Sequence, residues 1–261
     1  MTLFLHEIKR NKLALIIWTA AISFMLGICI LIYPEMSKEM GQISDMFADM
    51  GAFTDAFGMD QLNFGEFMGY FGIECGNVLG MGGAIFAAIL GVTTLAGEQK
   101  NGTAEFLLTH PVSRIRIAAE KLLSVAVQIL VLNVTVVIVC ILSIIAVGIE
   151  VNAGQIALIF LAYVILELEI GAITFCVSAF IKNGGFGIGI GVSMMLYFLN
   201  IVANISESVE FLKYVTPFAY TDSGYIINNN SLDFKYLVIG IAVSTISTAL
   251  ALWQFKKKDI S

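Results

Sequence analysis

Two carboxylates, Glu167 and Glu169, lie near the middle of a long apolar stretch. A charged side chain at the centre of a bilayer costs about 2.5–3.5 kcal/mol on insertion scales, so each acid must be paired, protonated or in contact with water. Two positions along an α-helix correspond to a rotation of about 200°, so the two acids point to different faces. One is a candidate for lining a translocation path or a subunit interface, while the other packs against Asn133, Asn200 or Asn204. The alternative is a protonated, hydrogen-bonded acid with a structural role.

Other chemistries find little support in the residue pattern. His6 and His110 have no carboxylate or cysteine at ligand spacing, which argues against a metal site. Ser–His catalysis inside a membrane would need a histidine within an apolar stretch, and neither histidine lies in one. No G-x-x-x-x-G-K-[ST] motif occurs, so the chain does not hold nucleotide phosphates by that loop. No basic patch with interleaved aromatic residues suggests nucleic-acid binding.

The composition indicates an integral membrane protein. Hydrophobic residues make up 58% of the 261 residues and charged residues only 13%. One soluble core of this size could not bury so much apolar surface, whereas a bilayer accepts apolar side chains on the outside of the fold. The cationic N-terminal residues precede an apolar run of about 21 residues, a length that predicts a retained membrane helix rather than a cleaved signal.

A membrane-spanning helix needs about 20 mainly apolar residues, and six stretches satisfy this. They lie at about 13–33, 69–96, 121–149, 155–181, 185–205 and 236–254. An even number of spans places both termini on the same side of the membrane. The expected architecture is an all-α integral membrane protein with one transmembrane domain over residues 1–261.

The distribution of lysine and arginine predicts the orientation, because positive residues concentrate in cytoplasmic segments. Eleven of these residues fall on one side: Lys9, Arg10, Lys12, Lys100, Arg114, Arg116, Lys121, Lys182, Lys256, Lys257 and Lys258. The other side holds three, namely Lys38, Lys213 and Lys235. Both termini are therefore expected in the cytoplasm.

Two segments on the expected outer side are long enough to contain structure. Residues 34–68 are acidic and carry Met and Phe at near-helical spacing, which suits amphipathic helices on the outer leaflet or a solvated acidic loop. Residues 206–235 are rich in aromatic side chains, typical of an interfacial or re-entrant element, with a break expected at Pro217.

The longest inner loop, 97–120, reads GEQKNGTAEFLLTHPVSRIRIAAE. Thr103 is a suitable N-cap for a short helix that Pro111 would end, and Ser113 can cap a second helix that continues into the third span. The loop is therefore predicted to hold a short surface helix between two tight breaks. Such an element could transmit a push from a cytoplasmic partner into the second and third spans.

This loop resembles the ABC-2 type permease family, the membrane subunits of ATP-binding-cassette exporters. The matching residues are Glu98, Lys100, Gly102, Thr103, Glu105, Leu107, Leu108, Pro111, Val112, Ser113, Arg114 and Lys121. Phe106 stands where the family usually has a Leu. The long acidic segment 34–68 also departs from the family pattern, so no role is carried over to it.

The resemblance implies a six-span permease whose inner loop is the coupling helix that docks on an ABC ATPase. The coupling residues would be Glu98, Lys100, Gly102, Thr103, Glu105, Phe106, Leu107, Leu108, Pro111, Ser113 and Arg114. It further implies that ATP and Mg are bound by a separate ATPase, present in two copies, and not by this chain. Six spans are half of such a transporter, so a second copy or a related permease is expected. The resemblance places the protein in a bacterial cell membrane.

Two other classes of function remain open from the residues alone. One is an ATP-independent secondary transporter or channel that uses Glu167 or Glu169 as a proton relay, although no internal inverted repeat is visible. The other is a membrane-anchored scaffold without transport activity. Neither needs an ATPase-docking loop. The transported substrate and the choice between homodimer and heterodimer are not readable from the sequence.

Overall fold

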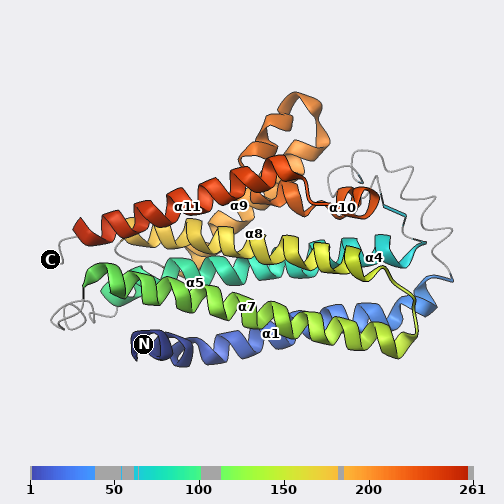
Figure 1. Ribbon diagram of the computed structural model, residues 1–261, viewed down its shortest axis with the longest axis horizontal. Coiled ribbons are helices and arrows are strands. Elements are labelled where there is room, and N and C mark those ends of the chain that lie inside the picture. Colours follow the sequence, from blue (N-terminus) through green and yellow to red (C-terminus); the bar gives the residue numbers. More distant parts are fainter. Residues whose placement is uncertain are drawn as a thin grey trace.

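The computed structural model describes residues 2–38, 54, 62–63, 65–100, 113–181 and 185–257. Within these residues every regular element is a helix (Figure 1). The helices are α1 (Thr2–Met36), α4 (Phe67–Glu74), η1 (Cys75–Gly80), α5 (Met81–Lys100), α7 (Arg114–Val147), α8 (Ala153–Phe180), α9 (Phe186–Ile205), η2 (Glu207–Tyr214), η3 (Pro217–Thr221), α10 (Ser223–Asn229) and α11 (Phe234–Lys257).

The described residues contain six helices long and apolar enough to cross a membrane, as the sequence predicts. The second of these spans consists of α4, the π-helical η1 and α5, which follow one another with no non-helical residue between them. The first and third begin earlier than the apolar stretches suggest, at Thr2 and Arg114. Their polar leading residues include Glu, Lys and Arg, which are good helix formers, and no Gly or Pro interrupts them.

Three expected features fall on residues outside the described part of the chain. They are the amphipathic helices of segment 34–68, most of which lies in that part, the short helix between Thr103 and Pro111, and the break at 182–184 between the fourth and fifth apolar stretches. These expectations therefore stay predictions.

The turn between α7 and α8 shows how local sequence sets the helix ends. Gly148 ends α7 at φ 73°, a left-handed conformation that glycine adopts without steric strain. The Asn152 side chain then caps α8 by accepting hydrogen bonds from the backbone N–H groups of Gly154 and Gln155, at 3.0 and 3.4 Å. The two long spans are thereby joined by a tight turn and run antiparallel.

Helix α8 is at the centre of the bundle, with its most extensive contacts against α5 and α11. Close approach to α5 depends on Gly91, because a Cβ there would lie only 2.6 Å from the carbonyl oxygen of Gly171. Helix α1 packs along α7, and α9 packs on α5. Most of the buried apolar side chains belong to one continuous core between these helices.

Many large apolar side chains nevertheless face outward along the spans, for example Leu13, Phe24, Ile145 and Phe186, which are 65–69% exposed. Outward-facing apolar surface of this extent is stable in hydrocarbon and not in water. The chain is thus a multi-pass membrane protein.

The start of α1 and the end of α11 lie together at one end of the bundle (Figure 1). We call this the termini end, and the opposite one the far end. At the far end η2, η3 and α10 connect α9 to α11, and Pro217 begins η3. The break expected at this proline is confirmed.

Candidate functional site

The inner loop meets the bundle at two points, the end of α5 and the start of α7. Residues 101–112 lie outside the described part of the chain. The structure places the residues on either side, which we call the first foot of the loop (the end of α5) and the second foot (the start of α7). The loop residues concerned are Gly102, Thr103, Glu105, Phe106, Leu107, Leu108 and Pro111. Lys100 ends α5, and Glu98 lies within its last turn.

The cap at the second foot is present. Ser113 precedes α7 in an extended conformation, and its hydroxyl accepts a hydrogen bond from the backbone N–H of Arg116 at 3.4 Å. A serine in this role satisfies one of the backbone donors that the first turn of a helix leaves unpaired. The predicted start of the second helix is therefore confirmed.

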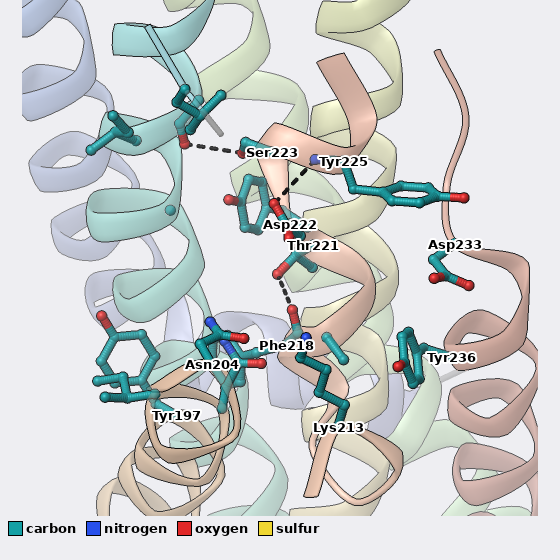
Figure 2. Close-up of a pocket in the computed structure, with 18 of the residues that line it drawn as sticks. Tyr197, Asn204, Lys213, Phe218, Thr221, Asp222, Ser223, Tyr225, Asp233 and Tyr236 are labelled. Atoms are coloured by element: carbon teal, nitrogen blue, oxygen red, sulfur yellow. Dashed lines mark hydrogen bonds between the residues drawn. The ribbon is translucent and has the colours of Figure 1, made fainter. Parts of the chain in front are cut away.

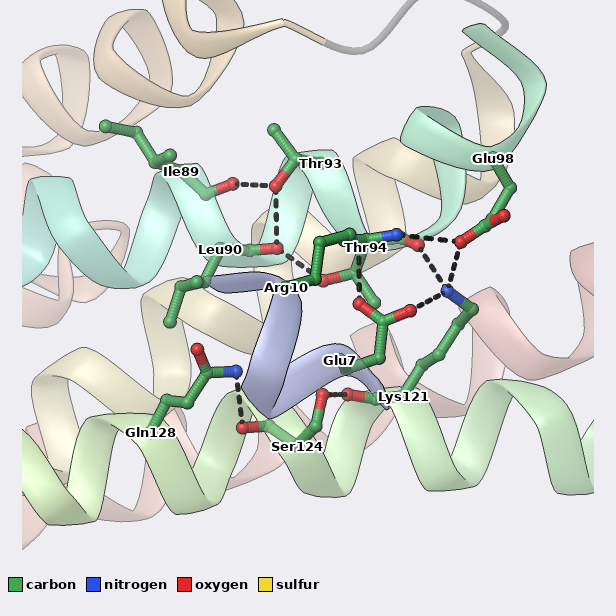
Figure 3. A network of polar contacts seen from close by, with 10 residues as sticks. All are labelled: Glu7, Arg10, Ile89, Leu90, Thr93, Thr94, Glu98, Lys121, Ser124 and Gln128. Atoms are coloured by element: carbon green, nitrogen blue, oxygen red, sulfur yellow. Dashed lines mark hydrogen bonds and ion pairs between the residues drawn. The ribbon is translucent and has the colours of Figure 1, made fainter. Parts of the chain in front are cut away.

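Lys121, about two turns further along α7, has a side chain only 1% exposed. Its ammonium group donates to Glu98 Oε1 at 2.8 Å, to the Thr94 carbonyl oxygen at 3.2 Å, and to Glu7 Oε1 (Figure 3). A lysine ammonium carries three protons, and these three acceptors match them. The contacts join the feet of the loop to each other and to α1.

Arg10 extends this group of charges on the solvent side. Its guanidinium contacts Glu7 Oε2 at 2.5 Å and Glu98 Oε1 at 2.9 Å, and its side chain is 29% exposed (Figure 3). Two acids and two bases thus meet, and we call Glu7, Arg10, Glu98 and Lys121 the ion cluster. Because every member has an opposite charge beside it, the desolvation that burial imposes is offset by short charge-assisted hydrogen bonds.

Two further polar contacts lie near the second foot. Arg114 Nη1 donates to the carbonyl oxygen of Lys256 at 3.5 Å, which connects the start of α7 to the end of α11. Arg116 pairs with Glu120 at 3.1 Å on an exposed face of α7. Of the predicted coupling residues, Glu98 and Arg114 therefore contact other spans at the termini end. Glu98 contacts Arg10 on α1, and Arg114 contacts Lys256 on α11. Ser113 caps α7 at the same end.

The first of the two intramembrane acids, Glu167, is fully buried. Its Oε2 accepts a hydrogen bond of 2.7 Å from Asn133 Nδ2 on α7, as one of the predicted pairings required. The other oxygen, Oε1, lies against Gly83 on α5, where a Cβ would overlap it. Glu167 is thus held between α5 and α7, and Gly83 provides the room for its carboxyl group.

The second acid, Glu169, points the other way, toward α11. Its Oε2 accepts a hydrogen bond of 2.7 Å from the Tyr220 hydroxyl in η3, and Gly240 leaves space for it as Gly83 does for Glu167. Burial, the charge of Glu169 and this hydrogen bond raise the pKa of Tyr220 well above its ordinary value, so the tyrosine keeps the proton it donates. The opposite orientation of the two acids agrees with the helical geometry.

Sequence comparison identifies the type of chain in which these features lie. The family model described as "ABC-2 family transporter protein" matches residues 1–260. The chain belongs to the ABC-2 transporter family. The resemblance seen in the inner loop is thereby confirmed over almost the whole length. No curated protein matches this ABC-2 protein by sequence.

Sequence reasoning did not find every polar residue of the site in this ABC-2 protein. The residue pattern does not single out Glu7. It marks Arg10 only as one of the cationic residues of the inner side, and Lys121 as one of these and as the last residue of the family pattern. The signal that could have revealed the cluster was Glu7 itself, an acid among basic residues at the start of a span. Tyr220, Gly83 and Gly240 gave no such signal, because only packing brings them to the acids.

Proposed function

We propose that this chain is the permease subunit of an ABC exporter, driven by a separate ATPase. The observation that carries the proposal is the ion cluster, since it joins both feet of the inner loop to a third helix. Family membership supports a transport role and agrees with the chain not being an enzyme itself. The ATP and Mg would be bound by the partner.

The inner loop 97–120 would be the coupling element that docks on the ATPase. A loop pushes on its spans only if its feet are rigid, and the feet are held by Lys121 bonding to both Glu98 and Thr94. Because Lys121 also bonds to Glu7, movement of the loop would carry α1 together with α5 and α7. Coupling would then reach three of the six spans by direct contact.

The orientation follows from charge. Lys/Arg residues at the start of α1, the start of α7 and the end of α11 lie at the termini end, which supports a cytoplasmic position for this end and for the loop. The far end would face the outside of a bacterial cell. The complete transporter would contain two permease chains, either two copies of this one or a pair of related chains, and two ATPase copies.

Glu167 and Glu169 remain candidates for the translocation path. Both are buried within this one chain, so a path role would require α5, α7 or α11 to move away from them during the transport cycle. Gly83 and Gly240 would permit such movement, because no side chain on them locks the carboxyl groups in place.

The experiment that tests the proposal is purification of the tagged protein from its native host in mild detergent, with mass identification of co-eluting proteins. We expect a stoichiometric soluble protein that contains a Walker A motif. Replacement of Glu105 and Phe106 by alanine should abolish its co-elution. Arg116→Ala is the matched control, because Arg116 is 66% exposed on α7 and belongs neither to the proposed coupling residues nor to the ion cluster.

A second membrane subunit in the same peak would establish a heterodimer. Elution of the chain alone, with no ATPase under any condition that preserves the fold, would contradict the docking role of the loop. An ATP-independent carrier that uses Glu167 or Glu169 would then be the better explanation.

A further inference from the structure

A cavity of about 300 Å³ lies at the far end of the bundle, and neither the ion cluster nor the two buried acids are among the residues that line it. Its walls come from α4 and η1, from α9, and from the segment η2–η3–α10 that leads to the start of α11 (Figure 2). This volume is at the lower limit of the range typical of small-ligand sites. The cavity is formed within one chain.

Three asparagines on otherwise apolar spans line this cavity: Asn77 in η1, and Asn200 and Asn204 on α9. Asn200 and Asn204 are four residues apart and so share one face of α9. None of the three amides has a hydrogen-bond partner among the residues that the structure describes. The three amides are accessible from the cavity, so their donors and acceptors are available to a polar occupant.

The helix that carries Asn77 is irregular in a way that supports this reading. Cys75–Gly80 is a π-helical stretch between two α-helical segments of the same span. Such stretches are rare and are frequently found at functional sites, because the wider turn redirects a side chain. Here Asn77 is exposed to the cavity although its neighbours Cys75 and Leu79 are buried.

The opposite wall carries both signs of charge. Glu210 and Lys213 form an ion pair at 3.6 Å. Lys235 has no ion-pair partner among the described residues, while the nearby Asp233 uses one oxygen to accept a hydrogen bond from the Lys235 backbone N–H at 3.0 Å. Figure 2 shows Tyr197 and Asn204 on one wall and Asp233 and Tyr236 across from them. Because acids and lysines occur together on this wall, a zwitterion can place each of its charges beside a group of opposite sign.

The rim of the cavity has the character of a membrane interface. Phe211, Tyr214 and Val215 lie outside the six spans, and each has at least 50% of its surface exposed. Exposed aromatic side chains at this position are typical of the headgroup region of a bilayer. Two of the lining residues, Asn204 and Lys235, lie at the end of α9 and at the start of α11, where these two apolar spans end.

We propose that this cavity binds a zwitterionic headgroup that combines a phosphodiester with an ammonium, as in an aminophospholipid. The phosphodiester would be held by the Lys235 ammonium and by the amides of Asn200 and Asn204. The ammonium would be held by the carboxylates of Glu210 and Asp233. This site does not depend on the proposed ATPase partner, since all of the residues belong to this chain.

The test is lipid retention by the purified full-length protein reconstituted in nanodiscs of defined composition. The probes are phosphatidylethanolamine and phosphatidylglycerol with identical acyl chains, and the bound lipid is identified by native mass spectrometry. Lys235→Ala and Asn200→Leu should each weaken retention of phosphatidylethanolamine by about tenfold, the effect of losing one charge-assisted or buried hydrogen bond. The matched controls are Lys38→Ala and Asn229→Leu, which alter exposed residues outside the cavity.

Preferential retention of phosphatidylethanolamine that these cavity variants lose and the controls keep would support the proposal. Equal retention of the two lipids, or equal retention by cavity and control variants, would overturn it. Free glycerophosphoethanolamine distinguishes the source of the headgroup: saturable binding to wild type without retained lipid would assign the same chemistry to a soluble ligand. Asn204→Leu provides a second cavity variant if Asn200→Leu does not fold.

Discussion

Glu98 Oε1 lies 2.8 Å from Lys121 Nζ, a contact that closes the inner loop at its base. The two residues flank the loop in sequence, one in the last turn of α5 and the other near the start of α7. The same ammonium bonds to Glu7 on α1, so one side chain holds three helices together. This makes Lys121 the residue through which displacement of the loop is expected to reach the bundle.

The first prediction concerns the removal of this charge. Lys121→Met keeps the length of the apolar stem but removes the ammonium group that Glu7 and Glu98 share. Loss of one member of a buried ionic group typically destabilises a protein by about 3–5 kcal/mol. We expect a loss of this order in unfolding by SDS titration in mixed micelles.

The control for Lys121→Met is Arg116→Ala, which breaks a pair on an exposed face of the same helix and should leave stability almost unchanged. The triple variant with Glu7→Gln and Glu98→Gln should recover part of the loss, because no unpaired acids then remain. An unchanged unfolding midpoint in Lys121→Met would show that the ion cluster does not stabilise the junction of the three helices.

The second prediction tests the space beside Glu167. Gly83→Ala would place a methyl group where the carboxyl oxygen Oε1 now lies, so either the acid or α5 must shift and the hydrogen bond to Asn133 must weaken. Overpacking of this kind typically costs about 1–3 kcal/mol. Thermal unfolding in detergent measures it.

Gly97→Ala provides the control for Gly83→Ala, because a Cβ at Gly97 meets nothing within 4 Å. The control should be neutral or slightly stabilising, since alanine is the better helix former. Equal melting temperatures for the two alanine variants would mean that Glu167 moves aside without cost.

The third prediction concerns the hydroxyl that donates to Glu169. Tyr220→Phe keeps the ring but removes the 2.7 Å hydrogen bond, which leaves a buried carboxyl oxygen without this donor. The cost of an unsatisfied buried polar group is about 1–3 kcal/mol. Tyr214→Phe is the control, because the Tyr214 side chain is half exposed and its ring contact with Tyr236 survives the change. A Tyr220→Phe protein as stable as this control would show that Glu169 finds another donor.

The features that the sequence predicts correctly are those that depend on neighbouring residues. Runs of apolar residues predict the six spans, Ser113 predicts the start of α7, and Pro217 predicts the break at the far end. The rotation between Glu167 and Glu169 follows from helix geometry alone. Such signals are local, so they can be read without knowledge of the fold.

The partners of the polar residues cannot be predicted from local sequence, because the packing of the helices determines them. Three asparagines were candidates for contact with an acid, and only the fold shows that Asn133 meets Glu167 while Asn200 and Asn204 line the far cavity. Likewise Glu7 and Lys121 are 114 residues apart, and no periodicity connects them. Long-range pairing of this kind depends on which helices lie side by side.

The last prediction separates a path role for the two intramembrane acids from a structural one. Glu167→Gln and Glu169→Gln preserve shape, and the amide oxygen of Gln can still accept the hydrogen bond from Asn133 or Tyr220. The fold should therefore survive, whereas a function that needs the carboxyl group itself should not. We expect at least one of the two variants to lower ATP turnover of the complex in proteoliposomes by about tenfold, without loss of the ATPase partner. Wild-type turnover in both single variants would leave the acids with a structural role only, and the path would have to be lined by other residues.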